Sequence, residues 1–213
     1  EPLNNFLNTA WGHQYYILRQ EFFNAKIHSF TSPVESILIT FGGTDQNNLT
    51  SKILDDICSI CFDYEIEINI VTGGGYLYIN ELKEKISSLL ERGLKINYEH
   101  HSGYISNIME KCQLAITANG RTIYELAHLN IPSLVFSHHA RETTHLFAQE
   151  NNGFFPMGLY DESSSQNLIR LMLKLISDNN FRQEAFLKIE ENSFTGNKKR
   201  VLNLLNAVLK KES

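Results

Sequence analysis

The chain has 213 residues, of which 42% are hydrophobic and 20% are charged, the balance of a globular protein with enough apolar material for a sizeable core. Its formal net charge of -5 offers no basic field, so we expect no nucleic-acid partner. No apolar run approaches the ~20 residues of a membrane span, and the start, Glu1-Pro2-Leu3, lacks a signal-peptide pattern, so we expect a cytoplasmic protein without a membrane span.

Residues 1–35 show no strong hydrophobic periodicity. We interpret them as a linker or edge segment that packs over the side of a domain formed by residues 36–213. Ser32-Pro33 marks the end of this segment, since proline disfavours continuation of a regular element.

The first predicted strand spans 36–41, an almost continuous apolar run typical of a parallel strand buried on two faces. The turn Gly42-Gly43-Thr44-Asp45 follows, and Thr44 or Asp45 can cap a helix that runs to about Phe62. Two interpretations remain open for this turn. Its backbone N–H groups bind a phosphate or a sugar, or it is an ordinary connection with a cap.

The predicted helix contains Cys58 and Cys61, a CxxC spacing that occurs in redox motifs and in half of a zinc site. Here the spacing falls inside an apolar helical pattern, and no second CxxC follows. We therefore interpret these residues and Cys112 as core thiols in a reducing compartment.

A second strand is predicted over 66–71, and Thr72-Gly73-Gly74-Gly75 leaves it without the GxGxxG pattern of a dinucleotide site. We interpret this loop as a flexible lip of a cleft. A helix over 79–91, a third strand over 94–98 and a short helix that begins within 104–109 complete this part of the chain.

The stretch Leu114–Pro132, LAITANGRTIYELAHLNIP, reads as a strand, a tight turn and a helix that begins at Arg121, with another strand over 134–136. Gly120 lets a ligand approach the turn, and the free N–H groups of a helix start favour an anion. Glu125 could accept hydrogen bonds from a diol. A phosphate at the turn and a ribose at Glu125 would describe one end of a nucleotide.

Beyond this unit, His138 and His145 have a spacing that could place them on one helix face. No HExxH pattern accompanies them, so we expect cleft-lining or surface histidines and no metal. Helical patterns begin near Ser163, Asp178 and Asn197. The alternation predicts an α/β fold with a Rossmann-like parallel sheet of about six strands and helices on both faces.

Several of these residues resemble the C-terminal domain of GT-B-type nucleotide-sugar enzymes. They are Gly120, Thr122, Tyr124, Glu125, Pro132 and Gly153, together with the segments Tyr15–Phe22 and Ile39–Asp45. Within that group the likeness is greatest to the UDP-sugar hydrolase of pseudaminic acid synthesis and its spore-coat polysaccharide relatives. The resemblance spans roughly residues 15 to 155. It implies one half of a GT-B fold, a UDP-sugar substrate, no cofactor, and a missing N-terminal half that holds the family's catalytic histidine.

The resemblance also implies a set of nucleotide-binding residues, and no catalytic residue in this chain. The set is Gly42, Gly43, Thr44, Ile105, Asn119, Gly120, Arg121, Thr122, Glu125, Arg141 and Glu142. Ile105 would form an apolar wall for the uracil, whose edge backbone groups would contact; the alternative places Ile105 and Ile108 in the core. For Glu125 the alternative to ribose binding is a solvated residue paired with Arg121. Arg141-Glu142 or His139 stands where the family has an Asn-Gln pair.

Two functions follow. The first is the UDP-sugar-binding domain of a GT-B-like hydrolase or glycosyltransferase in surface-polysaccharide or nonulosonic acid biosynthesis. In that case the isolated chain should turn over UDP-sugars very slowly or not at all, because the base lies in the other half. The second is a non-catalytic binding or assembly module fused to a sugar-activating enzyme. The absent Asn-Gln pair favours the second function, as does Arg121, where the family prefers a small residue.

Overall fold

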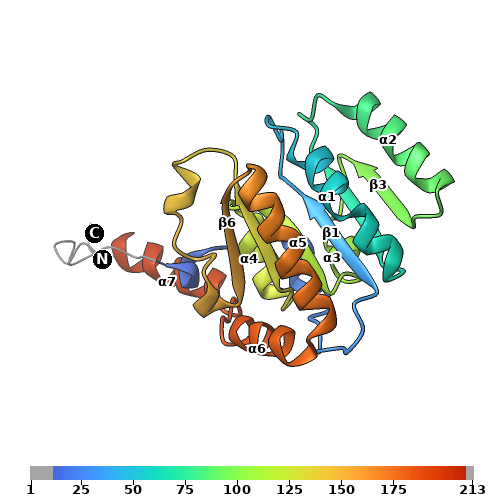
Figure 1. Ribbon diagram of the computed structural model, residues 1–213. Helices are drawn as coiled ribbons and strands as arrows, with labels where there is room; N and C mark the ends of the chain where they lie inside the picture. The colour runs from blue at the N-terminus through green and yellow to red at the C-terminus, as the bar shows by residue number, and fades with distance from the viewer. Residues whose placement is uncertain (1–11, 210–213) are drawn as a thin grey trace.

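The computed structural model describes residues 12–209, which form an α/β fold in which strands and helices alternate (Figure 1). The described strands form one six-stranded sheet with the order β3-β2-β1-β4-β5-β6, and every neighbouring pair is parallel. The predicted Rossmann-like sheet is confirmed. Its strands are β1 (Ser36–Thr40), β2 (Glu67–Thr72), β3 (Ile96–His100), β4 (Leu114–Ala118), β5 (Ser133–Ser137) and β6 (Phe154–Leu159).

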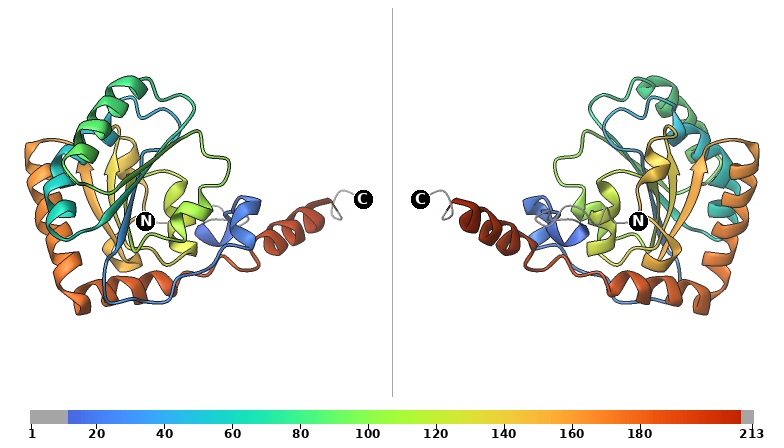
Figure 2. Two further views of the ribbon diagram at one scale, coloured as in Figure 1. Left: turned by 90° about the vertical axis from the view of Figure 1, so that its right-hand side faces the viewer. Right: turned by 90° about the vertical axis from the view of Figure 1, so that its left-hand side faces the viewer.

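The helices lie on both faces of this sheet, except the last one, which projects away from it (Figure 2). They are α1 (Leu49–Asp63), α2 (Ile79–Glu91), α3 (Ser106–Met109), α4 (Thr122–His128), α5 (Glu162–Ser177), α6 (Asn179–Glu190) and α7 (Asn197–Leu209). Short 3-10 turns occur at η1 (His13–Tyr15), η2 (Gln20–Phe23), η3 (Glu142–Thr144) and η4 (Glu150–Asn152). No described helix combines the length and the apolar character needed to cross a bilayer.

Two strands depart most from what the sequence predicted. The third begins at Ile96 instead of Leu94, because the N–H of Leu94 bonds to the carbonyl of Leu89 and closes the end of α2. The sixth strand had no predicted position, since Pro156 and Gly158 interrupt its pattern. It lies at the edge of the sheet, where a proline is tolerated, and its pairing with β5 shifts register at Val135 and Phe136.

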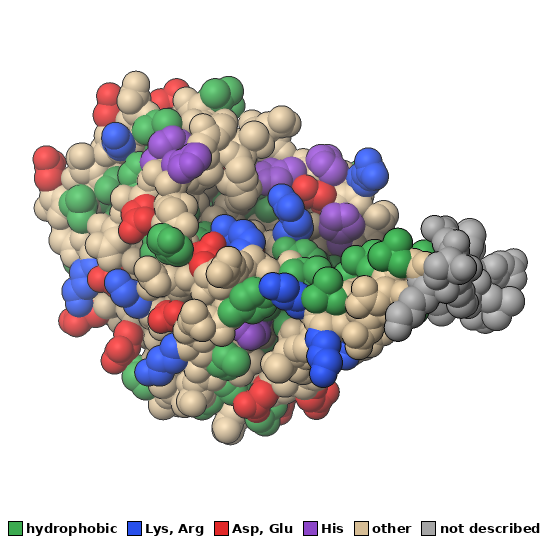
Figure 3. Space-filling view, turned by 180° about the vertical axis from the view of Figure 1, so that it is seen from behind, with side chains coloured by type: hydrophobic (Ala, Val, Ile, Leu, Met, Phe, Trp, Pro, Cys, Tyr) green, Lys and Arg blue, Asp and Glu red, His purple; other side chains and the backbone are tan. Residues whose placement is uncertain are grey.

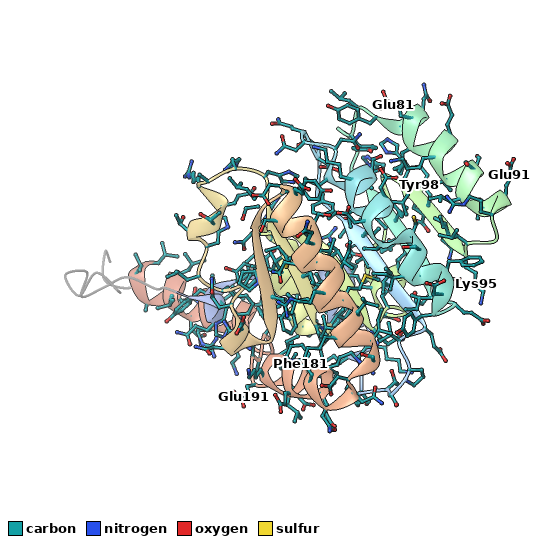
Figure 4. The ribbon with its side chains drawn as sticks, viewed as in Figure 1. Glu81, Glu91, Lys95, Tyr98, Phe181 and Glu191 are labelled. Carbon is teal, nitrogen blue, oxygen red and sulfur yellow. The ribbon has the colours of Figure 1, made fainter. Side chains whose placement is uncertain are left out.

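Alternate residues of the strands belong to two separate hydrophobic cores, one on each face of the sheet. Ile37 and Ile39 face the side covered by α1, α2 and α5, whereas Leu38 faces the side covered by α3 and α4. This two-sided burial explains the continuous apolar runs, because both faces of a parallel sheet are covered. In Figure 4, Glu81 and Glu91 mark the two ends of α2, and Tyr98 stands on the neighbouring strand β3.

The segment that precedes β1 packs against the α3–α4 side of the sheet. Leu18 and Phe22 are buried in that core, and the N–H of His28 bonds to the carbonyl of Leu129. Residues 1–11 of the predicted linker lie outside the described residues, and the boundary at residue 35 stays a prediction. The important consequence is that residues 12–35 reach α4, next to the centre of the sheet.

The order of the strands fixes where a ligand would bind. From β1 the chain proceeds to β2 and β3 on one side, and then returns to β4 on the other side of β1. The strand order reverses between β1 and β4, and open parallel sheets bind ligands outside the carboxyl ends of the strands at such a point. Gly42-Gly43 lie in the loop that follows β1, and Arg121 and Thr122 lie where the loop after β4 meets the start of α4.

Candidate functional site

A cleft of about 340 Å³ lies at the carboxyl ends of the central strands. Its walls come from five parts of the chain that are distant in sequence: the N-terminal segment, and the regions at the ends of β1, β2, β3 and β4. The lining residues are Tyr16 and Arg19; Thr40, Gly42 and Gly43; Val71, Thr72, Gly73 and Gly74; His101, Ser102 and Ile105; and Arg121, Thr122 and Glu125. Six of the predicted site residues meet here, namely Gly42, Gly43, Ile105, Arg121, Thr122 and Glu125.

One wall of the cleft consists of two glycine loops packed together. Gly42 has a φ of 77°, a conformation that favours glycine, and its carbonyl accepts a hydrogen bond from the N–H of Gly73 at 3.2 Å. The N–H of Gly75 donates to the carbonyl of Gly43 at 2.9 Å. A Cβ on Gly73 would lie 2.4 Å from the Cα of Gly43. The predicted lip of the cleft is therefore hydrogen-bonded to the first turn, and glycine is required for their close approach.

Asp45 holds the first turn onto α1. Its carboxylate is 2% exposed and accepts hydrogen bonds from the N–H of Leu49 at 2.8 Å and of Thr50 at 2.9 Å. Of the two predicted capping residues, Asp45 serves the first turn of the helix, while Thr44 is exposed and does not line the cleft. The turn is thus a capped connection that also lines the cleft, and the binding of a phosphate or a sugar by its N–H groups stays a prediction.

Glu125 is buried on the opposite wall and pairs with a residue from the N-terminal segment. Its side chain lies against Arg19, with Nε 2.7 Å from Oε1 and Nη2 3.1 Å from Oε2. The residue is 4% exposed. The alternative of a solvated Glu125 paired with Arg121 is wrong, because the two-point contact of Arg19 satisfies a carboxylate that α4 turns inward.

The charge balance at Glu125 is set by burial and by its neighbours. Burial raises the pKa of the Glu125 carboxyl, because a charged group is costly away from water. The hydrogen bonds and charge of Arg19 act against that rise, and Arg121 does so more weakly. Glu21 adds to the rise, and its Oε1 lies 2.9 Å from Nη1 of Arg19.

Aromatic contacts fix the N-terminal segment against α4. The ring of Tyr16 stacks on that of Tyr124 with centroids 4.4 Å apart, and Tyr124 packs on Phe147 at 4.8 Å. Stacked pairs of this kind favour one relative orientation. They hold the segment so that Arg19, three residues after Tyr16, reaches the carboxylate of Glu125.

Ile105 is 9% exposed, lines the cleft and belongs to the core cluster beneath α3. It therefore fits both the predicted apolar wall and its alternative. The carbonyl of Ile105 accepts the N–H groups of Ile108 and Met109, and the N–H of Ser106 donates to Oε2 of Glu21 at 3.0 Å. These backbone groups start α3 and join it to the N-terminal segment.

Five predicted site residues do not line the cleft: Thr44, Asn119, Gly120, Arg141 and Glu142. The amide of Asn119 donates to the carbonyl of Glu142 at 2.8 Å, and the Glu142 carboxylate accepts the N–H of His138 at 2.7 Å. Arg141 is exposed. The Glu142 carboxylate therefore bonds to the backbone of the loop after β5 and does not line the cleft.

The cleft-lining residues that were not predicted as site residues from the sequence include Tyr16, Arg19, His101 and Ser102. Tyr16 and Arg19 lie in the segment Tyr15–Phe22, and its resemblance to the GT-B enzymes is the feature of the sequence that could have pointed to them. His101 has a φ of 57°, and its ring packs so closely on Gly74 that a Cβ there would lie 2.4 Å from Nδ1. Over residues 12–209, no group of three or more His, Cys, Asp or Glu residues is arranged to hold a metal ion.

No protein-family model matches the sequence. The chain is 33% identical over 129 residues to the uncharacterized protein MJ1062 of Methanocaldococcus jannaschii, a match that covers 59% of this chain and 26% of that protein. The chain thus spans about a quarter of this curated relative.

Solved structures resemble the chain over more of its length than this relative does. MurG of Acinetobacter baumannii superposes with a TM-score of 0.63 at 16% identity, over 84% of this chain and 51% of MurG. The pneumococcal O-GlcNAc transferase GtfA, solved with UDP and GlcNAc, superposes with a TM-score of 0.57 at 17% identity, over 85% of this chain and 38% of GtfA. HepE of Anabaena, solved with UDP and glucose, superposes with a TM-score of 0.58 at 14% identity, over 83% of this chain and 48% of HepE. The fold is that of one Rossmann-like half of a GT-B glycosyltransferase.

Proposed function

We propose that the chain binds a UDP-sugar in the cleft, as the donor-binding half of a GT-B-like hydrolase or glycosyltransferase. One observation carries this proposal. Gly42-Gly43 from the β1–α1 connection, Ile105 from the β3–α3 connection and Glu125 from α4 line one cleft at the point where the strand order reverses. To these residues the interpretation of the sequence gives a phosphate or a sugar at the glycine turn, the uracil at Ile105 and the ribose at Glu125.

The cleft offers groups suited to each part of such a ligand. Ile105 supplies an apolar surface for the base, and the Glu125 carboxylate is an acceptor for a diol. Arg19 and Arg121 supply positive charge to the cleft, in which a diphosphate leaving group would develop negative charge. The UDP named in the complexes of GtfA and HepE supports this choice of nucleotide.

In the proposed reaction, water or an acceptor hydroxyl attacks the anomeric carbon of the sugar, the bond from that carbon to the diphosphate oxygen breaks, and UDP leaves. We assign the general base to a second Rossmann-like half, so that this chain binds the donor and stabilises the leaving group. The proposal also places the protein in the cytoplasm and in surface-polysaccharide or nonulosonic acid biosynthesis. If the isolated chain hydrolyses UDP-sugars robustly, His101 becomes the first candidate base, since it lines the cleft whereas His138 bonds to the carbonyl of Phe41.

A non-catalytic binding or assembly module is the second candidate function. Its support is the inward carboxylate of Glu142, which bonds to the backbone of His138 where the family has an Asn-Gln pair. A protein that contains this chain and both halves, yet binds UDP-sugars without turning them over, would favour the module over the enzyme.

A thermal-shift comparison of UDP, CMP, GDP and UDP-N-acetyl sugars tests the proposed ligand. Binding to the folded state stabilises it by about 2.7 kcal/mol when the ligand is ~100 times its Kd. We expect UDP and UDP-sugars to raise the midpoint, and Glu125→Gln to reduce that rise. Glu190→Gln, an exposed change on α6 outside the cleft, is the matched control and should respond as the wild type does. Equal responses to all nucleotides would remove the preference for UDP.

A further inference from the structure

The ion pair between Arg19 and Glu125 joins two parts of the chain that are 106 residues apart. Arg19 contacts both oxygens of the carboxylate and also Glu21, whose other oxygen accepts the N–H of Ser106 at the start of α3. The side chain of Glu125 is 5% exposed, whereas that of Arg19 is 52% exposed and lines the cleft. One guanidinium therefore contacts the N-terminal segment, α4 and the cleft.

This geometry leaves acceptor capacity on Glu125. An ionised carboxylate has about four lone-pair sites, and the two contacts from Arg19 use one site on each oxygen. A vicinal diol can donate to both oxygens from another direction only if neither oxygen carries a proton. A two-point arginine contact fixes the plane of the carboxylate as well as its charge.

We propose that Arg19 is a positioning residue of the nucleotide site, which holds the Glu125 carboxylate charged and in one orientation so that both of its oxygens accept from a ribose diol. This role rests on the proposed function. It gives the N-terminal segment a part in ligand binding that the sequence reading did not assign. Arg19 acts through Glu125, and its own charge adds to the field of the cleft.

The charged and titratable groups around Glu125 decide how the proposal can be tested. Arg19 and Glu21 face it from the N-terminal segment, Arg121 from the start of α4, and Tyr16 from the ring stacked on Tyr124. Arg121 has no hydrogen bond to Glu125 and acts on it through charge at longer range. A substitution of Arg121 therefore removes a nearby cation but keeps the two-point contact of Arg19.

The experiment measures the UDP affinity of the full chain by calorimetry between about pH 8 and about pH 5, together with a carbon-13 NMR titration of the Glu125 carboxyl without ligand. We expect Arg19→Ala to raise the pKa of that carboxyl and to weaken UDP binding by about tenfold or more, with the loss increasing as the pH falls. Arg19→Lys should restore part of the affinity, because it keeps the cation but not the two-point contact. Arg19→Gln, which keeps most of the side-chain stem, replaces Arg19→Ala if that variant does not fold.

Two comparisons separate this role from a merely structural one. Arg121→Ala should weaken binding and should add less pH dependence than Arg19→Ala does, because Arg121 acts on the pKa of Glu125 more weakly than Arg19. Arg19→Ala combined with Glu125→Gln should lose the pH dependence that Arg19→Ala adds, since the titrating carboxyl is gone. If the wild type binds UDP and Arg19→Ala follows the same pH profile, the positioning role is wrong while the nucleotide site stands. If the wild type does not bind UDP at any pH, the proposed function fails.

Discussion

Two walls of the cleft are shaped by different means. After β1, the turn at Gly42-Gly43 is shaped by backbone contacts to the Gly73–Gly75 loop and by the local cap from Asp45. After β4, the cleft wall depends on a buried carboxylate at Glu125, whose partner Arg19 comes from before the sheet begins. The wall at Gly42-Gly43 is held mainly by close backbone packing, and the wall at Glu125 mainly by charge.

The difference predicts how each wall should respond to substitution. A change in the glycine loops should reduce stability first, because backbone atoms must move apart. A change at Glu125 should reduce affinity first, because Arg19 is half exposed and can be solvated when its partner is lost.

The largest expected effect is that of Gly73→Ala. Its new Cβ would lie 2.4 Å from the Cα of Gly43, and forced overpacking of this kind costs ~1–3 kcal/mol or more. We expect a loss of ~3 kcal/mol in the free energy of unfolding, measured by urea denaturation. Gly103→Ala is the control, because nothing lies within 4 Å of its added Cβ, and it should change stability by ~0.5 kcal/mol or less. If Gly73→Ala lowered the free energy of unfolding no more than Gly103→Ala does, the two loops would not be held in contact.

Glu125→Gln sharpens the comparison from the other wall. Hydrogen bonds to a charged acceptor are roughly twice as strong as neutral ones, so we expect UDP affinity to fall by about tenfold to a hundredfold, or ~1–3 kcal/mol. Calorimetry measures this fall, and urea denaturation should record a smaller change in stability. A variant that loses stability but keeps its UDP affinity would make Glu125 a structural residue.

The same contrast explains what the sequence could predict. The β1 turn was predictable in kind, since its glycines and its capping aspartate are neighbours in the chain, and so was the parallel sheet with its apolar runs. The pairing of Arg19 with Glu125 was not, because hydrophobic period and turn chemistry carry no information on contacts 106 residues apart. Arg141 and Glu142 were placed in the site by the resemblance, but the chain uses Glu142 to bond the backbone of its own loop.

Asp45→Asn tests whether the first turn also depends on charge. The carboxylate accepts two backbone N–H groups, and an amide can offer only one oxygen in its place. We expect a loss of ~1–2 kcal/mol in the free energy of unfolding. Asp55→Asn, the same change at an exposed residue of α1 paired with Lys85, should cost ~0–1 kcal/mol. If both variants have equal stability, the turn does not rely on its cap.

The smallest effect concerns pH. Burial raises the pKa of Glu125 in the folded protein, so the folded state takes up a proton at a higher pH than the unfolded chain does. The free energy of unfolding of the wild type should therefore rise relative to that of Glu125→Gln as the pH falls from about 7 to about 5, by less than ~1 kcal/mol. A relative fall on acidification would show that the ion pair with Arg19 outweighs burial.

The central claim is that the cleft binds a nucleotide through a diol on Glu125. Calorimetric titration of the wild type with UDP and with its 2′,3′-dideoxy analogue tests it most directly. We predict that UDP binds in a one-to-one complex and that the analogue binds about tenfold to a hundredfold more weakly, a difference that should shrink in Glu125→Gln. Equal affinity of the wild type for the two compounds, or no binding of UDP, would contradict the claim.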